Sequence, residues 1–118
     1  MDDKVYLTLP AKPRYLSLAR LAASGICVGV DIDMDTLSDI RLLLTESCNL
    51  SFEIGETEAI DIVLMPEDDG IRFSVSGVRK ERVDSDEALQ ITEMIIESLA
   101  DELTFDEDKI IVYKNFGV

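Results

Sequence analysis

The sequence contains no histidine and no tryptophan, and its 118 residues include only two cysteines. Histidine is the residue that most often serves as a general base near neutral pH or binds a transition metal. A metal site built on imidazole and a histidine base are therefore excluded. Walker A, Gly-x-Gly-x-x-Gly, Cys-x-x-Cys and Gly-x-Ser-x-Gly motifs are also missing, so those nucleotide, redox and hydrolase sites have no support.

Long apolar runs are missing as well. None approaches the roughly 20 residues that a membrane-spanning helix needs, and the first residues lack the pattern of a secretory signal. We therefore expect a cytoplasmic protein that does not insert into a membrane. In that setting Cys27 and Cys48 are predicted to be reduced core thiols, with a disulfide between them as the alternative.

Acidic residues dominate the charge. The net charge is −14, while 47% hydrophobic and 31% charged residues indicate a globular chain that forms one domain over residues 1–118. Such a charge repels nucleic acid and anionic membranes, and it favours a basic protein partner. The alternative is that the acidic surface only keeps the protein soluble.

The first half of the chain predicts one strand and two helices. Residues 4–9 are strand-like and end at Pro10, and Pro13 suits the first turn of a helix that runs to about Cys27. A second helix begins near Asp35 and ends near Phe52. Apolar residues recur every three to four positions in both helices, namely Leu18, Leu21, Ala22 and Ile26, then Leu37, Ile40, Leu44 and Cys48, widened by Leu43 and Leu50.

The second half predicts a hairpin, a helix and a last strand. Strands over 59–65 and 71–77 are joined by a turn rich in Pro, Asp and Gly. Residues 78–87 are expected to form a loop or a frayed helix start, capped by Asp84 or Ser85. A helix follows, whose apolar stripe contains Ala88, Ile91, Ile95, Leu99 and Leu103, with Ile96 beside it. A strand over 109–116 then closes the chain.

This order of elements predicts the fold class. We expect an α+β two-layer sandwich, in which three helices cover one face of a mostly antiparallel sheet of four or more strands.

Several short motifs then point to a family. They are Pro10-Ala11-Lys12-Pro13 with Tyr15, Arg20-Leu21 with Ser24-Gly25, and Thr45-Glu46-Ser47-Cys48 in the second helix. The chain resembles the bacterial anti-sigma-factor serine/threonine kinases, a branch of the GHKL (Bergerat-fold) ATPases, which typically read Pro-Ala-x-Pro-x-Tyr, Arg-Leu-x-x-Ser-Gly and Ser-Glu-Ala-Cys-Thr-Asn there. Residues 95–102 and 112–116 are similar to the last helix and closing strand of that family, so the resemblance covers nearly the whole chain.

The residues that bind ATP in that family are changed here. The family's magnesium-binding Asn, four residues after the Glu, corresponds to Leu50, which offers no oxygen ligand. Asn49 is adjacent, but one helical residue turns a side chain by about 100°, so we expect it to face elsewhere.

The other nucleotide motifs differ as well. The family's adenine-binding Asp-x-Gly corresponds to Ser76-Gly77-Val78, and its Gly-Leu-Gly-Leu phosphate turn corresponds to Gln90-Ile91-Thr92-Glu93. The stretch from Gly77 to Ala88 is short for an ATP lid. Of the family's site only Glu46 remains, as a vestigial candidate for the catalytic base; by residue type alone it is an ordinary exposed helix Glu.

The resemblance therefore implies a degenerate regulator that binds a sigma factor, an anti-sigma antagonist or a paralogous kinase without nucleotide-dependent catalysis. No cofactor is expected. The first helix is expected to supply the partner contacts, with Arg20 as a charged anchor flanked by Pro13, Tyr15 and Ser17. The alternative for Arg20 is an ordinary surface pair with a nearby acid.

Two other functions stay open. The first is a weakly active serine kinase that uses ATP and magnesium. The second is a structural dimer or paralogue-pairing module, and the resemblance implies a homodimer in any case.

Overall fold

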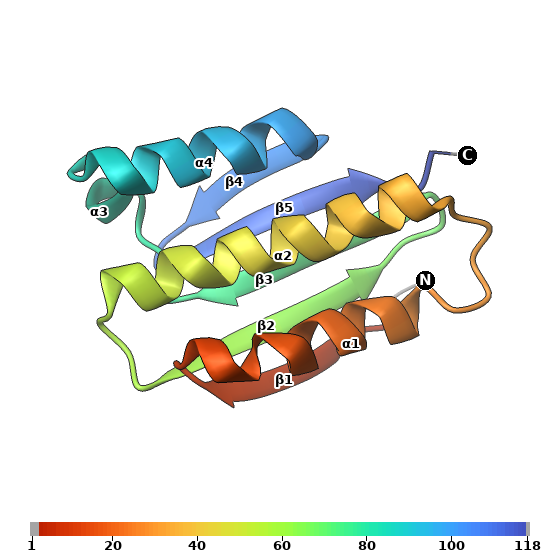
Figure 1. Ribbon diagram of the computed structural model, residues 1–118, viewed down its shortest axis with the longest axis horizontal. Coiled ribbons are helices and arrows are strands. Elements are labelled where there is room, and N and C mark those ends of the chain that lie inside the picture. Colours follow the sequence, from red (N-terminus) through yellow and green to blue (C-terminus); the bar gives the residue numbers. More distant parts are fainter. Residues whose placement is uncertain (1–2, 118) are drawn as a thin grey trace.

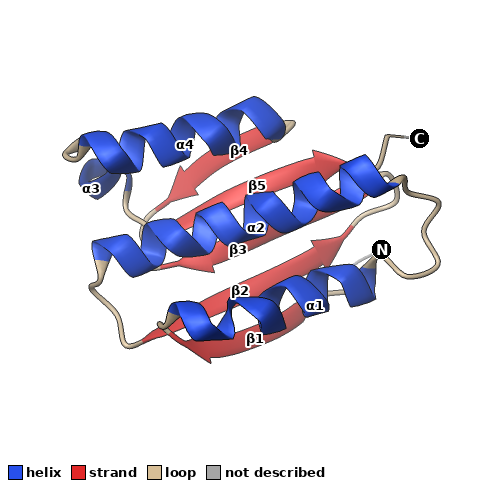
Figure 2. Cartoon of the chain, viewed as in Figure 1, coloured by secondary structure: helices blue, strands red, loops and turns tan. Residues whose placement is uncertain are grey.

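A five-stranded antiparallel sheet with helices on one face forms the body of the computed structural model, which describes residues 3–117 (Figures 1 and 2). The predicted α+β sandwich is confirmed, with one more strand than the minimum expected. The strand order is β1-β2-β3-β5-β4, and the strands are β1 (Val5–Pro10), β2 (Ala59–Pro66), β3 (Gly70–Ser76), β4 (Glu102–Asp106) and β5 (Lys109–Asn115).

The helices form the second layer. In Figure 1, α1 lies over the β1–β2 side of the sheet, α2 crosses its middle and α4 lies over β4. None of the helices in the described part of the chain is long and apolar enough to cross a membrane. The helical segments are a 3₁₀ turn η1 (Pro13–Tyr15), α1 (Leu16–Ile26), α2 (Met34–Ile54), α3 (Lys80–Asp84) and α4 (Glu87–Leu99).

The core lies between α2 and the central strands. Phe73 of β3 pairs with Leu64 of β2 and with Val112 of β5, and all three are buried under the helices. From α2, Ile40, Leu44 and Cys48 fill the opposite side of this layer, as the helical spacing predicts. Alternation along the strands therefore sets which face of the sheet the helices cover.

The ends of α2 have clear causes. Asp33 caps its first turn, because its carboxylate accepts a hydrogen bond of 2.7 Å from the backbone N–H of Thr36. Gly55 ends the helix in the left-handed conformation at φ 68°. The predicted start at Asp35 is thus two residues late, since Asp35 already lies within the first turn.

Helix α1 buries a different face from the predicted one. Ala19, Ala23 and Cys27 pack into the core, whereas Leu18 and Leu21 are exposed. Small side chains let α1 lie close to α2 and the sheet, so the helix is held by its alanines. Of the predicted stripe, Ala22 and Ile26 are half-buried against the core, and Leu18 and Leu21 are left on the surface.

The same correction applies to α4. Leu89 and Ile96 are buried, whereas Ile91 and Ile95 of the predicted stripe are exposed. Leu103 does not belong to the helix at all, because it lies in β4.

The segment before α4 also differs from the prediction. It contains the short helix α3, and the N-cap of α4 is Asp86 instead of Asp84 or Ser85. The sequence-based order of elements also lacks β4, which pairs with β5 at the edge of the sheet.

Candidate functional site

The predicted partner residue Arg20 lies where α1 meets α2. Its guanidinium Nη1 donates a hydrogen bond of 3.3 Å to the hydroxyl of Thr45. The two side chains line a surface hollow of about 300 Å³ together with Ser38, Arg41 and Leu42. The hollow is cationic because two guanidinium groups line it and no carboxylate does.

Arg20 forms no ion pair with any residue in the range 3–117, so the alternative of an ordinary surface pair does not apply there. The neutral hydroxyl of Thr45 orients the guanidinium without cancelling its charge. Leu18 and Leu21 are exposed on the same helix. Arginine is enriched among the residues that contribute most to binding at protein interfaces.

The other predicted partner residues lie just before Arg20. Pro13 and Tyr15 form the turn η1, and Ser17 is in the first turn of α1. Pro13 and Ser17 are exposed, whereas Tyr15 is half-buried and packs against the core. They share one end of α1 with Arg20, but only Arg20 lines the hollow.

The candidate base Glu46 lies in the middle of α2. It lines a separate cavity of about 310 Å³ between α2 and the first turns of α4. The expectation that Asn49 faces elsewhere is wrong, because Asn49 lies beside Glu46 in this cavity, with its Nδ2 3.5 Å from Oε1. Leu50 is fully buried in the core. Glu53, Asp86, Ala88, Leu89 and Thr92 complete the lining.

This cavity does not fit a magnesium–polyphosphate group. Glu46, Glu53 and Asp86 bring three carboxylates to the lining, and no lysine or arginine is among the lining residues. Among residues 3–117 no group of three or more Asp, Glu or Cys side chains is placed to hold a metal ion, so a polyphosphate would meet charge of its own sign without a bound magnesium to offset it. The reaction steps of a kinase have no geometric support here.

Helix α4 offers no phosphate turn either. Its N-terminus, where backbone N–H groups could bind an anion, is occupied by its own Asp86 carboxylate. That carboxylate accepts hydrogen bonds from the N–H groups of Ala88 at 2.9 Å and Leu89 at 3.4 Å. Residues 90–93, which correspond to the family's glycine turn, are regular helix, and Glu93 is ion-paired with Lys80 at 2.8 Å.

The short connection before α4 is fixed by ion pairs. The Glu56 carboxylate accepts from Arg79 at 2.9 Å on both oxygens and also pairs with Arg82. The hydrogen bond from Arg79 is the main reason that the pKa of Glu56 lies below its usual range. Lys80 pairs with Asp84 as well as with Glu93. The segment aligned with the family's ATP lid is thus tied to the loop that follows α2 and to α4.

The two cysteines are free and buried, as predicted. Burial raises the pKa of Cys48 to about 12, although the nearby positive charge of Arg20 acts in the opposite direction. Burial also raises the pKa of Cys27. Both residues are therefore thiols near neutral pH and act as core side chains.

No family model matches the sequence. Similarity to curated proteins is nevertheless clear. The chain is 34% identical over 70 residues to the serine-protein kinase RsbW of Listeria monocytogenes strain HCC23, a match covering 59% of this chain and 40% of that protein. RsbW of Staphylococcus aureus strain JH9 is 26% identical over 140 positions, covering 99% of this chain and 83% of the relative.

Fold similarity agrees with these matches. The crystal structure of the RsbU and RsbW domains of a Mycobacterium tuberculosis protein superposes with a TM-score of 0.69 at 15% identity, over 96% of this chain and 32% of that one. In sequence and in fold the chain is similar to the RsbW serine-protein kinases. The resemblance inferred from the motifs is thereby confirmed. The matched segment is less than half the length of the Listeria RsbW proteins.

The alignment with the Staphylococcus RsbW runs over 140 positions, although this chain has only 118 residues. At least 22 residues of that relative, the difference between the two numbers, therefore have no counterpart here. The chain is thus shorter than that relative over the aligned region.

Motifs identified Arg20 and Glu46, but not the residues around them. Ser38, Arg41 and Thr45 reach the hollow of Arg20 from α2, and their spacing of three to four residues is the pattern that could have placed them on one face. Glu53 and Asp86 join Glu46 only through the packing of α4 on α2. No local pattern connects residues so far apart in the sequence.

Proposed function

We propose that this chain is an anti-sigma-type regulator that binds a protein partner through α1 without phosphoryl transfer. The partner is a sigma factor, an anti-sigma antagonist or a paralogous RsbW-type kinase. The observation that carries the proposal is the guanidinium of Arg20, which has no ion pair among residues 3–117 and lines a hollow that contains no carboxylate, on a helix that also exposes Leu18 and Leu21. The RsbW relatives support a regulatory role of this kind.

The hollow between α1 and α2 suits an acidic side chain of the partner. A carboxylate inserted there would meet the planar guanidinium of Arg20, with Arg41 and the Ser38 hydroxyl also in the lining. Burying Leu21 against the partner would add apolar contact and exclude water from this pair. Charge complementarity with the Arg20 side chain would then set which partner is accepted.

The first test of this binding role is charge reversal at Arg20. Arg20→Glu should weaken capture of a purified sigma factor or antagonist from the same genome by about a hundredfold or more, which is on the order of 3 kcal/mol. Surface plasmon resonance would measure the affinity. Lys109→Glu is the matched control, because it makes the same charge change on the strand β5.

Circular dichroism should show both variants folded. Capture that survives Arg20→Glu, or that falls equally in Lys109→Glu, contradicts the α1 surface.

The absence of phosphoryl transfer is supported by the acidic cavity around Glu46 and by the burial of Leu50. We infer that Mg·ATP binds more weakly than millimolar. Titration calorimetry with ATP and magnesium should give no heat, and the melting temperature should not rise with ligand concentration. Saturable binding at micromolar ATP would overturn this part of the proposal.

A weakly active serine kinase is the second candidate, and one observation favours it. Asn49 lies beside Glu46 and could offer a magnesium ligand in place of the family's Asn. Transfer of phosphate from labelled ATP to a purified antagonist, lost in Glu46→Ala and in Asn49→Leu, would establish this activity.

A homodimer stays an expectation from the family. Light scattering on the purified chain would measure its mass. A dimer by itself is compatible with partner capture, so it would favour the purely structural role only if no sigma factor or antagonist binds.

A further inference from the structure

Helix α4 carries a second exposed apolar surface, on the side that faces away from the sheet. Ile91 is 60% exposed and Met94 66%, and Ile95 beside them is also exposed. Their spacing of three and four residues places them on one face, opposite the buried Leu89 and Ile96. We call Ile91, Met94 and Ile95 the α4 stripe. Adjoining exposed apolar side chains of this kind mark interaction sites.

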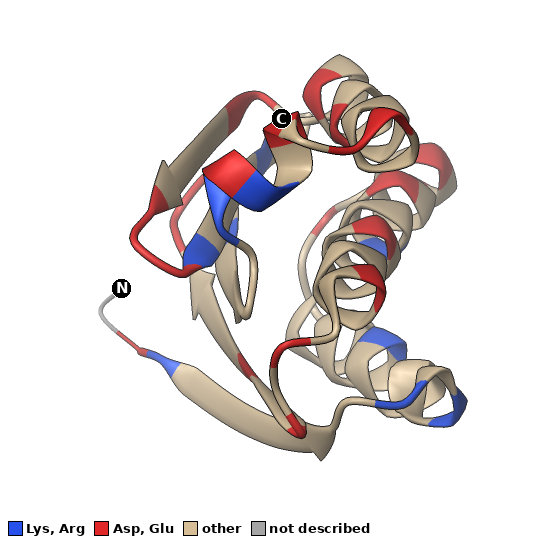
Figure 3. Ribbon diagram, turned by 90° about the vertical axis from the view of Figure 1, so that its left-hand side faces the viewer, with Lys and Arg blue, Asp and Glu red and all other residues tan. Residues whose placement is uncertain are grey.

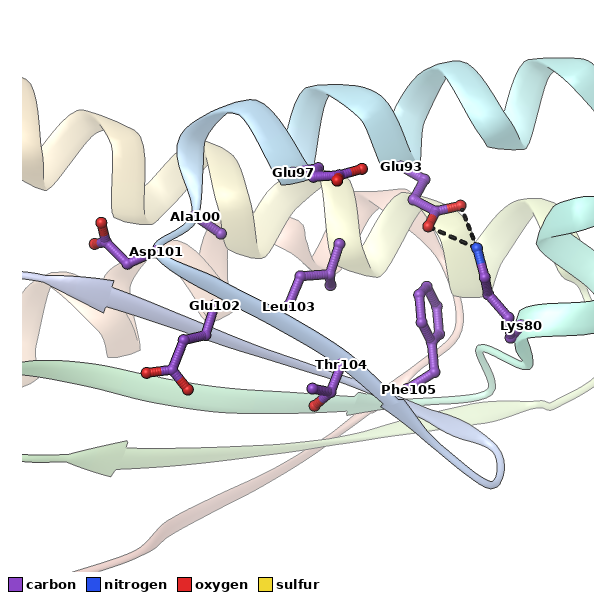
Figure 4. A pocket seen from close by; sticks show the side chains of 9 residues that line it. All are labelled: Lys80, Glu93, Glu97, Ala100, Asp101, Glu102, Leu103, Thr104 and Phe105. Atoms are coloured by element: carbon purple, nitrogen blue, oxygen red, sulfur yellow. Dashed lines mark hydrogen bonds and ion pairs between the residues drawn. The ribbon is translucent and has the colours of Figure 1, made fainter.

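Carboxylates border the α4 stripe on the β4 side. A groove of about 570 Å³ between α4 and β4 is lined by Glu93, Glu97, Asp101 and Glu102 (Figure 4). Lys80 is the single cation in this lining, and it is already bound to both carboxylate oxygens of Glu93 at 3.0 and 2.8 Å.

The remaining carboxylates of the groove differ in their contacts. Asp101 accepts from the N–H of Asn115 at 2.7 Å. Glu102 shares Arg72 with Glu67 on the sheet face that the helices do not cover, so it does not belong to the border of the stripe. Glu97 has no ion pair with a residue in the described range 3–117. The border therefore keeps a net negative charge.

Carboxylates also border the stripe on the α2 side. The cavity between α2 and α4 brings Glu46, Glu53 and Asp86 to this edge, and Glu87 lies in the first turn of α4. Lys80 is the only lysine or arginine that lines either hollow. The stripe is thus an apolar strip between two acidic borders.

The opposite end of the helical layer has the reverse charge. Arginines gather on α1 and the turn before it, whereas acidic residues dominate α2 and α4 (Figure 3). A ligand that suits Arg20 is therefore repelled at α4, and a ligand that suits α4 is repelled at α1. The two surfaces select different partners.

We propose that the α4 stripe binds a basic amphipathic helix of a partner protein, one whose apolar side chains are flanked by lysine or arginine. An α-helix fits because the stripe runs along α4, and two helices pack side by side at about 8–10 Å. Its apolar residues would cover Ile91, Met94 and Ile95, while its cations would reach the carboxylates on either border. Nucleic acid and anionic lipid surfaces are repelled by the same carboxylates.

The test uses two synthetic peptides of about 18 residues, long enough for about five helical turns. One has leucines spaced three and four residues apart with lysine on both sides of the stripe. The other has glutamate in place of each lysine. Fluorescence anisotropy would measure binding of the labelled peptides to the full chain.

Met94→Lys is the informative variant, and Met34→Lys is its matched control. Met94 is 66% exposed and Met34, in the first turn of α2, is 75% exposed, so both changes add one positive charge to a helix surface. The lysine peptide should bind the unmodified chain and Met34→Lys equally, and bind Met94→Lys at least about tenfold more weakly. Its affinity should fall as NaCl is raised from about 0.05 to about 0.5 M, because salt screens exposed charges.

Several outcomes would overturn the proposal. These are equal binding of the glutamate peptide, no binding of either peptide, and binding that Met94→Lys leaves unchanged. Sedimentation velocity tests the remaining occupant, a second copy of this chain. Self-association that Met94→Lys abolishes, together with no binding of either peptide, would mean that a second copy covers the stripe. None of these results bears on partner capture by Arg20, which is tested separately.

Discussion

Gly77 shows how a single residue fixes the connection between the sheet and the helices. It follows β3 with φ 77°, a conformation that favours glycine. A Cβ there would lie 2.5 Å from the Ser51 hydroxyl oxygen and 3.2 Å from that of Thr57. Ser51 is buried in α2, and its hydroxyl has no hydrogen-bond partner among the described residues. Gly77 thus permits the close approach of this turn to α2.

Gly77→Ala should destabilise the protein by about 2–4 kcal/mol, because it adds backbone strain and overpacks the contact with Ser51. Urea unfolding would measure the change. Gly25→Ala is the control: it lies in α1 with nothing within 4 Å of the added Cβ, and it should stabilise by about 0.5–1 kcal/mol.

Ser51→Ala separates the two causes. It should be neutral or slightly stabilising alone, since the hydroxyl is buried without a partner. Combined with Gly77→Ala, it should recover the part of the loss that comes from the clash and leave the part that comes from φ. A Gly77→Ala protein as stable as the parent would mean that neither cause operates.

At the scale of elements, periodicity predicted where α1, α2 and α4 lie but not which face they bury. Helix α2 has one apolar face, and its prediction holds. Helices α1 and α4 have apolar residues on two sides, and in both cases the larger stripe, such as Leu18 and Leu21 or Ile91 and Ile95, is exposed. Spacing alone cannot distinguish a core face from an interaction face, because both have the same period.

Periodicity does not predict strand β4, for a related reason. Leu103 continues the helical spacing of Ile91, Ile95 and Leu99, so this spacing places Leu103 in the helix. The alternation of Leu103 and Phe105 with Glu102 and Thr104 is the pattern of a half-buried strand, but it covers only five residues. Pairing with β5 is what determines its conformation.

The candidate site is likewise only partly predictable from the sequence. Arg20 and Glu46 follow from short motifs within single helices. Glu53 and Asp86 belong to the cavity of Glu46 only because α4 packs beside α2, which is a property of the tertiary structure. The cation of Arg20 and the acidic borders of α4 are visible in the sequence as charges, but their separation to opposite ends of the helical layer is not.

At the scale of the whole molecule, the excess of acidic residues opposes folding. A net charge of −14 in a compact chain raises the free energy of the folded state through self-repulsion. Local ion pairs such as that of Glu56 with Arg79 act in the opposite direction. With 25 acidic and 11 basic residues, repulsion outweighs the exposed pairs.

Salt should therefore stabilise the protein. Raising NaCl from about 0.01 to about 0.15 M at pH 7 should add about 1 kcal/mol and raise the melting temperature by roughly 4 °C. Differential scanning calorimetry would measure the change, and a melting temperature that salt does not raise would mean that the ion pairs outweigh the net charge.

Acid should destabilise the protein. Hydrogen bonds lower the pKa of Asp33 through the N–H of Thr36, and that of Glu56 through Arg79. A carboxyl with a lowered pKa stabilises the fold above its unfolded pKa of about 4, and this contribution is lost as the pH falls through the lower folded value. The melting temperature measured by calorimetry should thus fall as the pH is lowered below about 4. A melting temperature that stays constant there would contradict the contribution of these two carboxyl groups.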